Sequence, residues 1–265
     1  MPLTITTWNV NSVRIRLDGV AALVEALGPD VLCLQETKVV NDGFPSDAFE
    51  ALGYVHSVIN GIKGYNGVAI FSRLPFADSG VREWCGKADG RHAWATLENG
   101  VEINNFYVPS GGDVPDPQAN DKFAHKLQFL GEMINWFAAR SRPENKLVMV
   151  GDLNVAPLEA DVWSHQALRK VVSHTPVEVE ALDALKASHD WIDTARVFTP
   201  PEEQLYSWWS YRARDWDAAD RGRRLDHIWV TRALEGALAS VETLRAARGW
   251  DNHSDHVPVT LTLSL

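Results

Sequence analysis

The sequence predicts an α+β fold, a four-layer α/β sandwich in which two packed, mixed β-sheets are flanked by helices. Three observations favour it. Apolar, β-prone runs recur in both halves of the 265-residue chain. Each half also carries one long helical pattern. No linker, low-complexity tract or short repeat interrupts residues 1–265, so a single domain is expected over the whole chain.

The first half reads as a strand, a helix and a second strand. Residues 3–8 alternate like a strand, and Ser12 is positioned to cap a helix over residues 13–27. Gly28, followed by proline, would end that helix. Four apolar runs predict strands over 31–35, 54–58, 67–71 and 93–97, and a fifth run predicts a strand over 102–107.

The second half begins with a helix over residues 120–140, because apolar side chains recur there along one face. A buried strand over 146–150 should follow and end at Gly151. Residues 161–197 are predicted to be mostly helical. The chain then returns to strands over 228–230, 239–244 and 257–263.

Composition excludes some classes of function. The chain is 45% hydrophobic and 23% charged, as in an ordinary globular protein. It has no apolar run of about 18 residues and no leader-like start, so no membrane partner and a cytoplasmic location are expected. The two cysteines, Cys33 and Cys85, lack zinc-site spacing, and Cys33 should be buried in a strand.

The net charge of −10 argues mildly against nucleic acid as a partner. The distribution of charge matters more than its sum, however. Residues 211–224 carry five arginines against three aspartates, which leaves that segment positive.

Three short polar stretches lie next to apolar runs, and hence at strand ends. They are Gln35-Glu36-Thr37-Lys38, Gly151-Asp152-Leu153-Asn154 and Ser254-Asp255-His256. Carboxylates, amides and an imidazole brought together at strand ends suit a hard cation and phosphoester cleavage.

Each stretch also has a plainer interpretation. Glu36 could bind Mg²⁺ with Asn9 and Asn11 orienting a ligand or water, or it could be a surface glutamate beside a capping asparagine. Asp152 could hold or deprotonate a water, with Asn154 donating to a phosphoryl oxygen, or the pair could form an Asx turn that caps the next helix.

His256 could transfer a proton or bind phosphate as imidazolium, and Asp226 could orient its ring. A surface Asp-His pair is the alternative. Four acid sites at strand edges, each with an amide or imidazole neighbour, are hard to explain as separate accidents, and this conjunction favours a catalytic site.

The sequence closely resembles the exonuclease III family of DNA-repair nucleases, the apurinic/apyrimidinic (AP) endonucleases of the larger endonuclease/exonuclease/phosphatase superfamily. Glu36, Asp152 and His256 alone would indicate only the superfamily. The motifs that narrow it to this branch are Trp8-Asn-Val-Asn-Ser12, Gln35-Glu-Thr-Lys38 and Ser207-Trp-Trp-Ser-Tyr-Arg212. The resemblance also runs through Gly64-Tyr-Asn-Gly-Val-Ala-Ile70, Asn105-Phe-Tyr-Val-Pro109, Gly151-Asp-Leu-Asn154, Arg224-Leu-Asp226 and Ser254-Asp-His256. This resemblance implies a DNase I-like fold.

The resemblance also implies roles for individual residues. Glu36 would be the principal ligand of Mg²⁺, with Mn²⁺ as an alternative ion. Asp152 would activate the attacking water, Asp226 would hold His256, and Tyr107 would contact the phosphate or the leaving group. The positions implied for the metal site as a whole are Asn9, Asn11, Glu36, Asp152, Asn154, Asp255 and His256.

For DNA, the resemblance implies that Trp208, Trp209 and Leu225 form an apolar pocket for an extrahelical abasic sugar. The alternative is that the two tryptophans are core and rim of one strand. Backbone contacts are implied for Arg91, Arg212 and Arg223, with Arg214 and Arg221 as further candidates. Lys122 and Lys126 could also contact DNA, although a solvated helix face is the favoured interpretation for them. Asp220 and Arg223 depart from the family pattern, in a loop next to the implied abasic-sugar pocket.

The predicted function is Mg²⁺-dependent hydrolysis of phosphodiester bonds in double-stranded DNA, as a 3′→5′ exonuclease and an AP endonuclease of base excision repair. Removal of 3′ blocking groups is expected as well. The substrates would be DNA with abasic sites or recessed 3′ ends, and the protein a monomer, nucleoid-associated if bacterial. Two alternatives are another superfamily phosphoesterase, such as a small-molecule phosphatase or sphingomyelinase, and a non-catalytic DNA-binding module.

Overall fold

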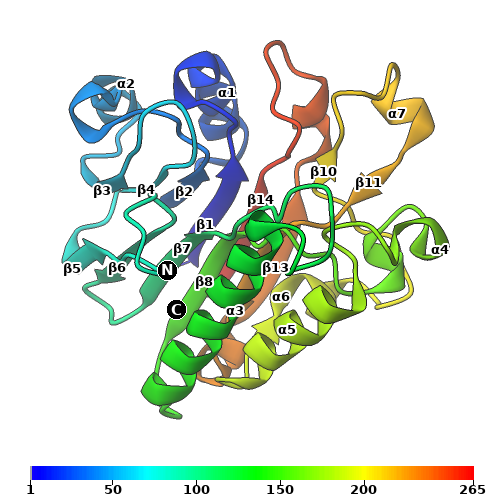
Figure 1. Ribbon diagram of the computed structural model, residues 1–265. Helices are drawn as coiled ribbons and strands as arrows, with labels where there is room; N and C mark the ends of the chain where they lie inside the picture. Colours follow the sequence, from blue (N-terminus) through cyan, green and yellow to red (C-terminus); the bar gives the residue numbers. More distant parts are fainter. Residues whose placement is uncertain (1) are drawn as a thin grey trace.

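Two six-stranded sheets form the centre of the molecule in this computed structural model, which describes residues 2–265 (Figure 1). The first sheet has the order β13 (Leu238–Thr243), β14 (Val259–Ser264), β1 (Pro2–Asn9), β2 (Val31–Gln35), β4 (Val68–Ser72), β3 (His56–Asn60). The second has the order β5 (Phe76–Val81), β6 (His92–Leu97), β7 (Glu102–Tyr107), β8 (Leu147–Asp152), β12 (Asp226–Val230), β9 (Ile192–Asp193). Both sheets are mixed, because β1 pairs with β2 and β7 with β8 in parallel while their other pairs are antiparallel.

The faces of each strand explain how the layers pack. In β2, Val31 and Cys33 point into the core between the two sheets, whereas Leu32 and Leu34 point toward the helices. Alternate residues of a strand face opposite sides, so a strand covered on both sides is apolar throughout. Cys33 is buried as predicted, and burial raises the pKa of its thiol.

Helices cover the outer face of each sheet (Figure 1). The first sheet packs against α1 (Leu17–Leu27) and α2 (Ser46–Ala51), and the second against α3 (Asp121–Arg140) and α5 (Pro176–Ala187). Besides short 3₁₀ helices, the other short elements of residues 2–265 are α4 (His165–Leu168), α6 (Thr194–Phe198), β10 (Trp208–Trp209), α7 (Trp216–Ala219) and β11 (Gly222–Arg223). The predicted four-layer sandwich is confirmed.

The expectation that Ser12 caps a helix over 13–27 is wrong. Residues 13–15 form a separate 3₁₀ turn, α1 begins at Leu17, and the Ser12 side chain makes no capping bond. The backbone amide of Ser12 instead donates to the Glu36 carbonyl at 2.7 Å. This contact with a distant loop, rather than a helix cap, fixes the turn at Ser12. Gly28 does end α1, with a φ of 53°.

Several boundaries also differ from prediction. The strand expected over 54–58 lies at 56–60, and β5 and the short β10 and β11 were not predicted. The span 161–197 contains three short or medium helices interrupted by turns and by β9. Among residues 2–265, no helix combines the length and apolarity needed to cross a bilayer.

Candidate active site

The predicted site residues meet at one edge of the two sheets because of strand register. Asn9 at the end of β1 pairs with Gln35, the residue before Glu36. In the second sheet, Asp152 lies between Tyr107 on one side and Asp226 on the other. Residues that are distant in sequence therefore share one edge.

Asp152 is buried and held by two amides. Its Oδ2 accepts from Asn9 Nδ2 at 2.9 Å and its Oδ1 from the Asn154 backbone amide at 2.9 Å. The second bond is the predicted Asx turn, although no helix follows it directly. Gly151 precedes it with a φ of 136°, and a Cβ there would lie 1.9 Å from the Phe106 carbonyl oxygen. Only glycine allows β8 to end this way.

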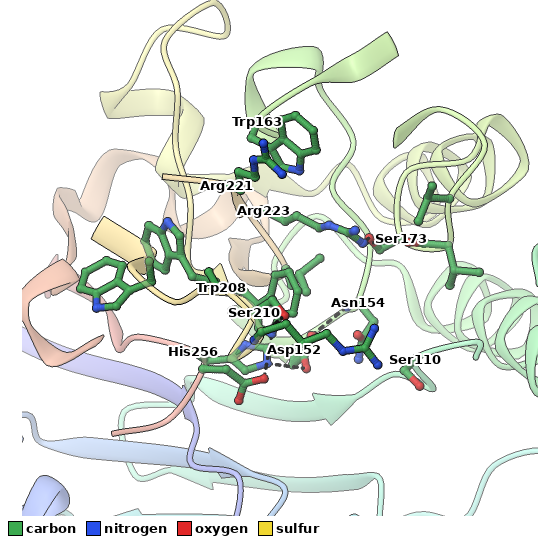
Figure 2. A pocket seen from close by; sticks show the side chains of 18 of the residues that line it. Ser110, Asp152, Asn154, Trp163, Ser173, Trp208, Ser210, Arg221, Arg223 and His256 are labelled. Carbon is green, nitrogen blue, oxygen red and sulfur yellow. Dashed lines mark hydrogen bonds and ion pairs between the residues drawn. The ribbon is translucent and has the colours of Figure 1, made fainter. Parts of the chain in front are cut away.

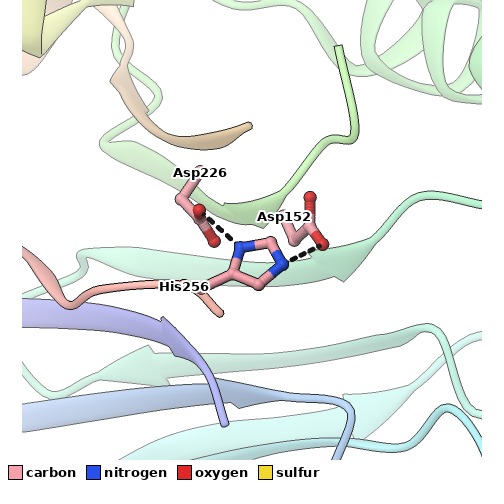
Figure 3. A group of neighbouring side chains, drawn as sticks. All are labelled: Asp152, Asp226 and His256. Carbon is pink, nitrogen blue, oxygen red and sulfur yellow. Dashed lines mark hydrogen bonds and ion pairs between the residues drawn. The ribbon is translucent and has the colours of Figure 1, made fainter. Parts of the chain in front are cut away.

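A histidine lies between two buried carboxylates (Figure 3). His256 Nδ1 donates to Asp226 Oδ2 at 2.8 Å, and its Nε2 lies 3.7 Å from Asp152 Oδ2. Ser207 Oγ donates to the same Asp226 oxygen at 2.7 Å. Burial opposes charge on the ring, but Asp226 and Asp152 outweigh it and raise the pKa of His256, so the ring is an imidazolium.

The same neighbouring charges also shift the pKa of Asp152. Burial raises the pKa of Asp152, and the negative charges of Asp226 and Glu36 raise it further, while His256 opposes them. Asp152 is therefore a stronger base than an exposed aspartate.

Glu36 is tied to the same cluster. Its Oε1 accepts from Asn9 Nδ2 at 3.0 Å and from the Tyr107 hydroxyl at 2.9 Å. Lys38 Nζ lies 2.8 Å from its Oε2. Burial acts to raise the pKa of Glu36, but the hydrogen bonds from Asn9 and Lys38 and the Lys38 charge lower it overall. Glu36 is thus ionised, and Asn9 bridges it to Asp152.

The oxygens of this cluster fit a hard cation. The ammonium of Lys38 rests on Glu36 and also donates to Asn11 Oδ1, so a cation already lies between two predicted metal ligands. Asn11 in turn donates to Asp255 Oδ1 at 3.1 Å, and Trp208 Nε1 donates to Asp255 Oδ2 at 2.9 Å.

A second group of candidate ligand atoms lies beside this one. Atoms of Asp152, Asp226 and His256 all lie within 4.8 Å of one another, and Asp226 Oδ1 is buried without a hydrogen-bond partner. Both ring nitrogens of an imidazolium are donors, so in this state only the two carboxylates could bind a cation, and the expected metal contact of His256 stays a prediction. Carboxylate and amide oxygens of this kind are what Mg²⁺ and Mn²⁺ prefer.

The expectation that Lys126 lies on a solvated helix face is wrong. Its side chain is fully buried, pairs with Glu178, and donates to the backbone carbonyl of Asn154 at 2.7 Å. Lys122, one turn earlier on α3, is exposed as expected. Periodicity alone does not reveal such a pair, because its partner lies 52 residues away.

Sequence reasoning also missed Glu178, whose carboxylate accepts from the backbone amides of Ser173 and Thr175. Thr175 and Glu178 form a capping box at the start of α5. The T-x-x-E pattern could have located this helix start. Asn154 itself has a φ of 54°, and its Nδ2 donates to the Val108 carbonyl at 2.9 Å.

A pocket of about 760 Å³ opens above these groups (Figure 2). Its lining combines the acids with apolar and cationic side chains, namely Glu36, Tyr107, Asp152, Asn154, Asp255, His256, Trp163, Trp208, Trp209, Leu225, Arg212, Arg221 and Arg223. Trp208 is partly exposed there, whereas Trp209 is 2% exposed and packs in an aromatic cluster. The two tryptophans are thus rim and core of one short strand that borders the pocket.

Other predicted DNA-contact residues lie elsewhere. Arg91 is outside the pocket lining. It donates to Asp89 and to the Tyr107 carbonyl and thereby helps to hold the Tyr107 backbone in place. Its contact with DNA stays a prediction. Arg214 is exposed on the lobe that carries α7. Asp220 accepts from Trp209 Nε1 at 2.9 Å and from Arg245, which makes it a structural residue of this lobe.

A family model described as the endonuclease/exonuclease/phosphatase family matches residues 6–256. The chain is 29% identical to the exodeoxyribonuclease III of Haemophilus influenzae, over 96% of this chain and 97% of the relative. Its structure is similar to that of an AP endonuclease from Archaeoglobus fulgidus, with a TM-score of 0.91, 32% identity, and coverage of 99% of this chain and 100% of that one. A 3′ phosphatase from Neisseria bound to a product DNA hairpin is similar at a TM-score of 0.90 and 32% identity, with the same coverage.

Proposed function

The chain belongs to the endonuclease/exonuclease/phosphatase family, and from this premise we propose that it is a Mg²⁺-dependent DNA-repair nuclease that hydrolyses phosphodiester bonds of double-stranded DNA. One observation carries the proposal. Glu36, Asp152, Asn154, Asp226 and His256 are scattered over most of the polypeptide, yet they form one cluster held by hydrogen bonds and by the 3.7 Å contact between His256 and Asp152. This cluster lies at the base of a pocket with aromatic and arginine walls.

The residues of the cluster have complementary roles. Glu36, with Asn11 beside it, would hold Mg²⁺ or Mn²⁺, which supplies the charge neutralisation that an anionic phosphodiester requires. Asp152, fixed by Asn9, orients the attacking water and accepts its proton, because its raised pKa makes it a competent base. His256 brings a positive charge to the phosphate oxygens.

Asn154 and Tyr107 complete the site. The second N–H of the Asn154 amide is available for a phosphoryl oxygen, since only one is used on Val108. Burial and the neighbouring charge of Glu36 raise the pKa of Tyr107, so its hydroxyl stays neutral. Its one proton is donated to Glu36 here, and it would assist the departing 3′ oxygen by turning from Glu36 to that oxygen. The products would be a 3′-hydroxyl and a 5′-phosphate.

Three activities follow for this one site, namely 3′→5′ exonuclease, incision 5′ to abasic sites, and removal of 3′ blocking groups. The relatives named as an exodeoxyribonuclease, an AP endonuclease and a 3′ phosphatase support them. Base excision repair is the process these activities serve. We propose that the protein acts as a monomer on DNA in the cytoplasm, or at the nucleoid if the source is bacterial.

The test uses one duplex that carries a central abasic analogue and a recessed 3′ end, incubated with Mg²⁺ or with a chelator. Product lengths and termini report each activity. Glu36→Ala and Asp152→Ala should each lower turnover by about 10²–10⁴-fold while leaving the thermal unfolding transition in place.

Glu25→Ala, which removes an exposed acid on α1, is the matched control and should keep full activity. Full activity of either site variant would contradict the assignment. Turnover of p-nitrophenyl phosphate without cleavage of duplex DNA would favour a small-molecule phosphatase instead.

A further inference from the structure

Two histidines outside the pocket lining face each other beside one of the loops that form it. His165 is the first residue of α4, and His174 lies two residues before the start of α5, in the loop whose residues 171–173 line the pocket. His165 Nδ1 and His174 Nε2 are 2.8 Å apart, and the two rings are nearly perpendicular. Neither histidine belongs to the catalytic cluster.

The hydrogen bonds of His174 show which of its ring nitrogens carries a proton. His174 Nδ1 lies 2.6 Å from the carbonyl oxygen of Ala156, which can only accept, so Nδ1 is the donor. Burial lowers the pKa of His174, so its ring is neutral and its Nε2 keeps a lone pair. This lone pair accepts the proton of His165 Nδ1. A neutral imidazole with a free lone pair is the form that binds a metal ion.

Both rings also have the outer partner that a metal-binding histidine usually has. Such a histidine donates the N–H of its other ring nitrogen to a backbone carbonyl or a carboxylate, which fixes the tautomer and the ring orientation. His174 donates to Ala156 in this way. His165 Nε2 lies 3.7 Å from Glu159 Oε1, and the exposed Glu159 side chain is free to close that distance.

We propose that His165 and His174 bind a late first-row transition-metal ion such as Zn²⁺, at a site separate from the oxygen-rich cluster at the base of the pocket. Imidazole nitrogen suits Zn²⁺, Ni²⁺ and Cu²⁺, whereas Mg²⁺ takes oxygen ligands. With two ligands from the protein, water fills the remaining positions of a tetrahedral ion. The inference does not depend on the proposed nuclease function.

Binding requires one change of tautomer and a small movement. The His165 proton passes through solvent from Nδ1 to Nε2, where Glu159 accepts a hydrogen bond from it, and Nδ1 is left with a lone pair. Two nitrogen ligands of tetrahedral Zn²⁺ are about 3.3 Å apart, so the ring nitrogens must separate by about 0.5 Å and the lone pairs must turn toward the ion. The 38% exposed side chain of His165 can move in this way, while His174 is 3% exposed and tied to Ala156.

An ion at this site would join segments that hydrogen bonds already connect. Ala156 accepts from the His174 ring, and its backbone amide donates to the Ser173 carbonyl at 2.8 Å. The ion would add a bond from this pair of segments to α4. Because it binds the folded chain, Zn²⁺ should raise the Tm of the protein, whereas Mg²⁺ should not do so through this site.

The experiment titrates the wild-type chain with Zn²⁺ in the presence of excess Mg²⁺. Isothermal titration calorimetry counts the bound ions, and NMR follows the imidazole ring signals. The wild-type chain should bind an additional equivalent of Zn²⁺ relative to His165→Ala, and Zn²⁺ should shift the ring signals of both His165 and His174. The NMR measurement uses the wild-type chain, so the inference does not depend on the folding of a variant. Ring signals that stay in place, or equal stoichiometry in the two proteins, would overturn it.

Matched variants locate the ion. Glu159→Ala should weaken Zn²⁺ binding at this site about tenfold, because it removes the outer partner of His165. His56→Ala removes a partly exposed histidine of β3 and should bind Zn²⁺ as the wild-type chain does. Unchanged affinity in Glu159→Ala would contradict the tautomer on which the site depends. Loss of the additional equivalent in His56→Ala would refute the assignment to His165 and His174.

Cleavage of duplex DNA shows whether the two sites are separate. His165 does not line the pocket, so His165→Ala should cleave DNA with Mg²⁺ as fast as the wild-type chain. Full cleavage together with the loss of one bound Zn²⁺ would support a separate site. A fall in cleavage as large as that of Glu36→Ala would contradict it.

Discussion

Replacing Lys126 with methionine is expected to destabilise the protein strongly, although the change is conservative in size. Lys126 and Glu178 are both fully buried, and Lys126 also donates to the Ser110 and Asn154 carbonyls. Methionine would leave the Glu178 carboxylate in the interior without its cation. Removing one partner of a buried ion pair costs about 3–5 kcal/mol. At about 2–4 °C per kcal/mol, this predicts a drop in Tm of about 6–20 °C.

Thermal and urea unfolding measure the effect, and Lys122→Met provides the control because it changes an exposed lysine one turn away on the same helix. Its cost should stay within about 0.5 kcal/mol. The double variant Lys126→Met, Glu178→Gln should be less destabilised than the sum of the two single variants, since it leaves no uncompensated charge. Equal stability of Lys126→Met and Lys122→Met would refute the reasoning.

Two further predictions concern charge. Burial acts to raise the pKa of Asp161 and Asp193, but the Arg224 guanidinium outweighs it and lowers the pKa of both carboxyls below the usual value. Their contribution to stability is therefore complete above about pH 4 and is lost as the pH falls further, so the wild-type chain should lose unfolding free energy more steeply than Arg224→Met in acid titrations below pH 4. Lys38→Met should strengthen Mn²⁺ binding up to about fivefold, because the ammonium competes for Glu36 in a pair worth about 0–1 kcal/mol. Metal-dependent thermal shifts test this, and weaker binding would show that Lys38 supports the metal site.

The position of the candidate site could be predicted from the sequence because it depends on local pattern. Apolar runs specify buried strands, and a polar residue directly after such a run must emerge at the edge of a sheet. Glu36 directly follows β2, and Asp152 is the last residue of β8. Their residue types then indicate an oxygen-rich, hard-cation site.

The sequence by itself thus determined the layers, the strands that carry the acids, and the residue types at the edge of the sheets. The reason is that the spacing of apolar residues within one element indicates which of its faces is buried. Only the tertiary structure decided which group meets which. It directed Lys126 inward to Glu178 and joined the Ser12 backbone to the Glu36 carbonyl. It also placed Arg223 at the end of β11 in the pocket wall, while the next residue, Arg224, pairs with Asp161. Those outcomes depend on register and on contacts between residues far apart in the chain, and no local pattern encodes them.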